Sequence, residues 1–68
     1  MDALVRRFRC PRAAIAYVRM ILEAYDGLAV MSSRRGDTLV EWWIAPGREG
    51  EADALARALF DEVALVPL

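Results

Sequence analysis

The fold is decided by residues 13–25, which read AAIAYVRMILEAY. At 100° per residue their polar side chains share one narrow stripe, and apolar side chains occupy most of the remaining circumference. Pro11 suits the first turn of such a helix, and Asp26-Gly27 suits its end because glycine readily adopts the left-handed conformation. We therefore predict a helix from Pro11 to about Tyr25, with more apolar surface than one neighbouring sheet would cover.

One flank of this helix is expected to pack on a sheet. That flank consists of Ala14, Val18, Ile21 and Tyr25. The surplus apolar surface lies at its margins, with Ala13 and Met20 on one side and Ile15 on the other. Met20 and Ile15 are therefore candidate contact residues for a partner.

The segments outward from the helix alternate in a regular way. Ala3–Cys10 alternates apolar and Arg residues, as a strand with one solvated face does, although Arg6 interrupts the pattern. Further strands are predicted at 28–33 and 38–45, joined by a polar turn at 32–37, because their β-branched and aromatic content is typical of strands. A second helix is predicted from about Glu49 to Val63, and the apolar tail 64–68 suits a short edge strand.

The predicted order is β-α-β-β-α-β. This order defines the α+β, ferredoxin-like (ACT-like) arrangement, an antiparallel sheet with both helices on one face. Right-handed crossovers leave few alternatives. We expect one domain spanning residues 1–68.

The other face of that sheet must meet water or a partner. Adjacent residues of a strand point to opposite faces, so only one of Trp42 and Trp43 belongs to the core. Glu41 marks the uncovered side, which places Leu39 and Trp43 on it, close to Arg7 and Arg9 of the first strand. An exposed tryptophan with aliphatic neighbours is typical of a contact surface, although arginine stems can also shield a single surface tryptophan.

The composition argues against catalysis and metal binding by this chain. It has no His and one cysteine, Cys10, so neither a metal site nor a nucleophile–base pair can be assembled. We expect no enzyme, no cofactor and a structural Cys10. Arg35-Gly36-Asp37 spells an integrin tripeptide, but a turn between two strands explains it better. The absence of a signal-peptide pattern and of a long apolar run predicts a cytoplasmic protein without a membrane segment.

Charge is unevenly distributed along the chain. Residues 1–35 carry seven arginines against three acids, whereas residues 36–68 carry two against seven. Trp43 between Arg7 and Arg9 imitates the aromatic platform of RNA-recognition modules. However, the net charge is −1 and Glu41 lies beside Trp43, which makes nucleic acid an improbable partner.

A resemblance rests on the segment Tyr25-Asp26-Gly27-Leu28-Ala29-Val30, preceded by Ile15-Ala16-Tyr17 and followed by Pro46-Gly47-Arg48-Glu49. Over about residues 8–60 the chain resembles a family of very short bacterial proteins, catalogued as domain of unknown function 4911. That resemblance implies no activity and no site residues. More distantly, the order of elements is similar to that of ACT-type regulatory domains, which bind amino acids. Their ligand loop usually bears a glycine, whereas this chain has Cys10-Pro11-Arg12, which puts an amino-acid site in doubt.

The leading hypothesis is a small non-catalytic domain that forms a homodimer or docks on a partner protein. Its candidate interface residues are Leu39, Trp43, Arg7, Arg9, Met20 and Ile15. A small domain buries only about 60% of the surface of its unfolded chain, so oligomerisation is a natural source of stability. An ACT-like small-molecule regulatory domain and an RNA-binding platform are the alternatives, and fold analogy alone does not decide between them.

Overall fold

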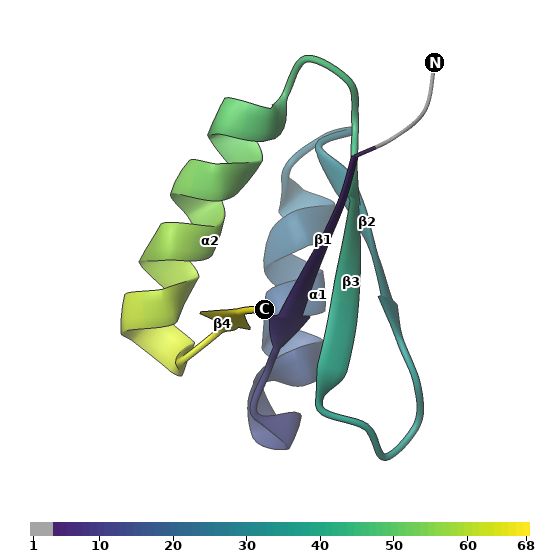
Figure 1. Ribbon diagram of the computed structural model, residues 1–68, viewed down its shortest axis with the longest axis vertical. Helices are drawn as coiled ribbons and strands as arrows, with labels where there is room; N and C mark the ends of the chain where they lie inside the picture. The colour runs from purple at the N-terminus through teal and green to yellow at the C-terminus, as the bar shows by residue number, and fades with distance from the viewer. Residues whose placement is uncertain (1–3) are drawn as a thin grey trace.

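The structure is a computed structural model that describes residues 4–68. Its elements follow the predicted order (Figure 1). They are β1 (Leu4–Arg9), a 3-10 turn η1 (Arg12–Ala14), α1 (Ile15–Ala24), β2 (Ala29–Ser33), β3 (Leu39–Ile44), α2 (Glu49–Val63) and β4 (Val66–Pro67). The sheet is antiparallel with strand order β2-β3-β1-β4, which confirms the ferredoxin-like fold. The predicted strand start at Ala3 lies outside the described residues.

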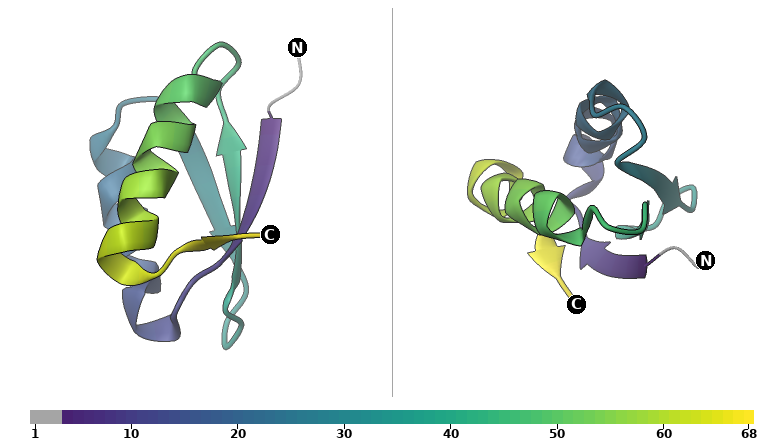
Figure 2. Two further views of the ribbon diagram at one scale, coloured as in Figure 1. Left: turned by 60° about the vertical axis from the view of Figure 1, so that its left-hand side comes forward. Right: turned by 90° about the horizontal axis from the view of Figure 1, so that it is seen from above.

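Both helices cover the same face of the sheet, as the view from above shows (Figure 2). The buried residues are all apolar, and they lie on β1, on β3, on both helices and in the segments that join the elements. They are Phe8, Cys10, Val18, Leu22, Leu28, Val40, Trp42, Ile44, Ala52, Leu59 and Leu65. Trp42 is the largest, and its ring lies 4.7 Å from that of Phe8 at an interplanar angle of 50°. Its indole N–H has no hydrogen-bond partner among the described residues.

The first helix departs from the prediction in two ways. Its first turn, after Pro11, is a 3-10 turn, and the regular helix begins only at Ile15. The predicted sheet-facing flank was wrong at its end, because Leu22 is buried and Tyr25 is 37% exposed. Tyr25 lies beyond the last helical residue with an extended backbone, so the helical spacing no longer applies to it. The stripe that packs on the sheet therefore runs through Val18 and Leu22.

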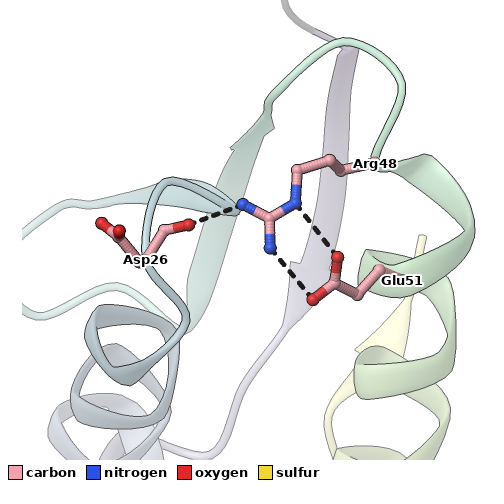
Figure 3. Close-up of polar contacts among 3 residues, drawn as sticks. All are labelled: Asp26, Arg48 and Glu51. Atoms are coloured by element: carbon pink, nitrogen blue, oxygen red, sulfur yellow. Dashed lines mark hydrogen bonds and ion pairs between the residues drawn. The ribbon is translucent and has the colours of Figure 1, made fainter.

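Arg48 joins the beginning of α2 to the turn that follows α1 (Figure 3). Its Nε and Nη2 each donate a 3.0 Å hydrogen bond to the Glu51 carboxylate, and its Nη1 donates to the Asp26 carbonyl oxygen at 2.6 Å. The hydrogen bond to Glu51 raises the pKa of Arg48 above its ordinary value, and the negative charges of Glu51 and Asp26 add to this effect. The side chain therefore ties together two segments that are 22 residues apart in the sequence.

The hairpin between β2 and β3 contains the predicted turn at Arg35-Gly36-Asp37. The amide of Asp37 donates to the carbonyl of Arg34 at 3.1 Å, and Gly36 has a φ of 79°, a value that a glycine adopts without a steric penalty. The hairpin turn therefore accounts for this tripeptide, as predicted.

Candidate interaction surface

The open face of the sheet is the surface that the sequence singles out. Alternation along the strands and the observed register define its side chains. They form three rows across the sheet: Val30, Trp43 and Val5; then Ser32, Glu41 and Arg7; then Leu39, Arg9 and Val66. Trp42 faces the helices, so the two adjacent tryptophans are divided between the faces, as predicted.

The first row is apolar. Trp43 pairs with Val5 of β1 on one side and with Val30 of β2 on the other. Trp43 is 46% exposed and Val30 is 70% exposed. Three apolar side chains from three strands therefore form a continuous strip that is exposed to solvent.

The middle row is polar and internally neutralised. Arg7 Nε donates to Glu41 Oε2 at 2.8 Å across the β1–β3 pair. Ser32 lies opposite Glu41 on β2. An ion pair this exposed contributes little to stability, but it cancels the charge of Arg7 beside the apolar strip.

The third row contains Arg9, whose Nη1 donates to Thr38 Oγ1 at 2.9 Å. Leu39 lies opposite Arg9 on β3 and is half-buried, while Val66 lies opposite Arg9 on β4 and is exposed. The same alternation places Leu68 on the open face, since its amide donates to the Arg7 carbonyl at 3.0 Å.

Large exposed apolar side chains gather on this face. Seven are described in total, and four of them, Val30, Trp43, Val66 and Leu68, project from the open face. The other three, Met20, Tyr25 and Phe60, belong to the helical layer and its end. We call the surface formed by Val5, Val30, Trp43 and their polar neighbours Arg7 and Glu41 the open-face patch.

The structure brings together four of the six predicted contact residues. Leu39, Trp43, Arg7 and Arg9 share the open face. Met20 is 58% exposed on α1, far from that face in the fold, and Ile15 is half-buried against the core. Residue-by-residue reasoning missed Val5 and Val30, because strands β1 and β2 lack a clean alternation at these positions and only the register shows that they flank Trp43.

Apart from the open face, a hollow lies between α2 and the edge of β1 beside β4. It has a volume of about 390 Å³ and is lined by Arg6, Phe8, Asp53, Ala56, Arg57, Phe60 and Pro67. Arg6 Nε lies 3.3 Å from Asp53 Oδ1 at its rim. Arg6 lies on the helix-facing side of β1, where the alternating pattern predicts an apolar residue. Its side chain reaches outward to the Asp53 carboxylate, which explains the interruption of the pattern.

Cys10 is fully buried at the end of β1. Burial raises the pKa of its thiol, and Sγ lies 3.5 Å from the Pro11 carbonyl oxygen. Both effects disfavour the thiolate, which is the nucleophilic form of a cysteine. The burial of Cys10 agrees with the prediction of a buried cysteine.

Residues 4–68 offer neither a cluster of metal ligands nor a helix that could span a membrane. Within this part of the chain no three His, Cys, Asp or Glu side chains group closely enough to hold a metal ion. Neither described helix has the length and apolar content that crossing a bilayer requires.

Comparison with known proteins identifies a family. A family model described as "Domain of unknown function (DUF4911)" matches residues 8–63. No curated protein and no solved structure matches the chain. The resemblance to ACT-type regulatory domains, beyond the shared order of elements, receives no support from these comparisons.

Proposed function

The chain belongs to the family described as Domain of unknown function (DUF4911), and we propose that it is a non-catalytic, cytoplasmic domain that forms a homodimer through the open-face patch. The observation that carries this proposal is the gathering of four of the seven large exposed apolar side chains on one face, with Val30 and Trp43 in the patch and Val66 and Leu68 beside it. Contiguous apolar side chains rimmed by polar residues are typical of protein interfaces.

A second copy of the chain is the occupant that this surface fits best. A two-fold contact places the same patch on both sides, so it requires a surface that is complementary to itself. The open-face patch meets this requirement, because Arg7 and Glu41 place both signs of charge side by side next to the apolar strip. In such a dimer the two Trp43 strips pack together, and the neutral Arg7–Glu41 pair of each copy lies at the rim of the contact.

The size of the surface is consistent with a dimer. A typical stable interface buries about 800 Å² on each partner. That is less than a fifth of the 4502 Å² that this chain exposes. Two stacked sheets also give each small domain a larger shared core.

Light scattering coupled to size-exclusion chromatography tests the proposal. We expect a dimer for the wild-type chain at tens of micromolar, and a monomer for Trp43→Lys. Met20→Lys is the matched control, because Met20 is also exposed but lies on α1. A wild-type monomer whose mass does not change with concentration would contradict the proposal, as would a Met20→Lys variant that dissociates while Trp43→Lys remains dimeric.

RNA binding at the same face is the weaker alternative. The guanidinium of Arg7 is held by Glu41, so it is not free to neutralise a phosphate. Trp43 is also the one aromatic side chain among the nine open-face residues of the three rows. Quenching of Trp43 fluorescence by single-stranded RNA, reversed by salt, would favour this alternative over the dimer.

A further inference from the structure

Five of the nine arginines lie at one end of the molecule, and none of them pairs with a carboxylate of residues 4–68. Arg6, Arg7 and Arg48 form the three ion pairs found among residues 4–68. Arg9, Arg12, Arg19, Arg34 and Arg35 form none in this part of the chain, and they belong to the end of β1, to η1 and α1, and to the β2–β3 hairpin. Positive charge is therefore concentrated without neutralisation at the hairpin end.

Four of these arginines line one hollow. It has a volume of about 450 Å³ and lies between the beginning of the first helix and the hairpin. Its lining residues are Arg12, Ile15, Ala16, Arg19, Ser33, Arg34, Arg35, Gly36 and Asp37. Helix and hairpin both lie at this end of the sheet (Figure 1). We call this site the arginine hollow.

Two of the guanidinium groups are positioned by neutral acceptors. Arg12 Nη2 donates to the Gly36 carbonyl oxygen at 2.8 Å, and Arg19 Nη2 donates to Ser33 Oγ at 2.5 Å. Each guanidinium carries five N–H donors, so these bonds leave most donors free and the full positive charge in place. The hairpin thus orients both side chains before any ligand arrives.

Acidic groups near the hollow are few. Asp37 lines it, and its Oδ1 accepts a 3.0 Å hydrogen bond from the Leu39 amide. Glu23 lies one helical turn after Arg19 and forms no ion pair with it. Four positive charges against one carboxylate at the lining leave a net charge of about +3, which suits an anion of similar charge.

We propose that the arginine hollow binds a small molecule that carries two linked phosphate groups. The planar guanidinium fork matches the geometry of phosphate oxygens and binds them in a bidentate manner. The volume falls within the range of small-molecule sites, about 300–1,000 Å³. The hollow lies on the helix side and the β2 edge of the sheet, so it is a surface separate from the open-face patch and does not depend on the dimer.

The test uses inorganic pyrophosphate as the probe, with isothermal titration calorimetry of the whole chain at low salt. We expect saturable binding with a Kd below about 1 mM. Arg19→Gln and Arg35→Gln should each weaken binding about tenfold or more, as expected for the loss of a charge-assisted hydrogen bond. Arg57→Gln is the matched control: it removes one positive charge from α2, at the other hollow, and should change the Kd by less than about twofold.

Several results would overturn the proposal. They are the absence of saturable binding, an equal loss of affinity in Arg57→Gln, and equal affinity for citrate, which would show a site for any polyanion. Tighter binding of a single-stranded oligonucleotide than of pyrophosphate, lost equally on mutation of each arginine, would identify a nucleic-acid surface instead. Arg35 lies in the exposed hairpin turn, so Arg35→Gln reports on binding even if Arg19→Gln impairs folding.

Discussion

Trp42 and Trp43 are neighbours on β3 and face opposite sides of the sheet, one completely buried and the other 46% exposed. Trp42 packs at 4.7 Å from Phe8 beneath the helices, whereas Trp43 lies in the apolar strip of the open-face patch. One residue step thus separates the centre of the core from the proposed interface, and the two indoles report on folding and on association separately.

The first prediction uses this separation. In Trp43→Phe the remaining emission comes from Trp42, so it should be blue-shifted and resistant to quenching by acrylamide, because the indole is inaccessible to solvent. In Trp42→Phe the remaining emission should be readily quenched in the monomer and protected as the concentration rises. Steady-state quenching at two protein concentrations measures both. Equal quenching of the two variants would contradict the assignment of opposite faces.

The second prediction concerns the bridge made by Arg48. Arg48→Lys keeps the charge but loses the paired hydrogen bonds to Glu51 and the reach to the Asp26 carbonyl. Both side chains are partly exposed, at 34% and 45%, so we expect only a small decrease in the free energy of unfolding. Urea denaturation measures it, and Glu51→Gln should lose less because the Asp26 contact remains. A wild-type midpoint in Arg48→Lys would show that the bridge adds nothing.

The third prediction concerns the end of α2. Ala64 has a φ of 61°, the left-handed conformation, and its amide donates to the Phe60 carbonyl at 3.1 Å. A side chain in that conformation is strained, so Ala64→Gly should raise the free energy of unfolding by about 0.5–1 kcal/mol. Ala58→Gly, at an exposed interior position of the same helix, is the control and should lower it by about 1 kcal/mol. Destabilisation by both substitutions would exclude strain at Ala64.

The fourth prediction concerns Tyr17, whose hydroxyl donates to Glu62 and so joins α1 to α2. This hydrogen bond raises the pKa of Tyr17 above its ordinary value of 10.0, with smaller contributions from burial and from the charge of Glu62. A raised pKa means that the folded state holds the phenolic proton more tightly than the unfolded state. The stabilisation is therefore complete below pH 10.0 and is lost as the pH rises through the folded-state pKa. Thermal melts should show a Tyr17→Phe deficit at pH 7 that shrinks above pH 10.0, and a deficit that does not change with pH would contradict it.

The order of elements and the two faces of β3 were predictable because they depend on local patterns. Alternation around Glu41 assigns Trp42 to the core, and Gly27 and Pro46-Gly47 separate helix from strand. The end of α1 was predicted to within one residue, but its sheet-facing flank was wrong there, because Tyr25 lies outside the regular helix and Leu22 is buried instead. A helical wheel applies only as far as the regular helix extends, which is to Ala24.

The two surfaces differ in how far the sequence predicts them. Trp43 was identifiable from β3 alone, but its partners Val5 and Val30 depend on strand register, which links residues far apart in the chain. The arginine hollow was visible only as an excess of charge in residues 1–35. The contacts that assemble it, Arg12 with Gly36 and Arg19 with Ser33, span 24 and 14 residues and follow from tertiary packing.

The short β4 is the part of the sheet that should open most easily. Val66 and Pro67 pair with Arg9 and Phe8, and the Leu68 amide adds one hydrogen bond to Arg7, so this strand is attached far more weakly than the ladder between β1 and β3. Amide hydrogen exchange should therefore be fast at Leu68 and slow along β3, with detachment of the last strand as the lowest-energy local opening. When that strand detaches, β1 becomes an edge strand, and its backbone is then open to pairing with another chain.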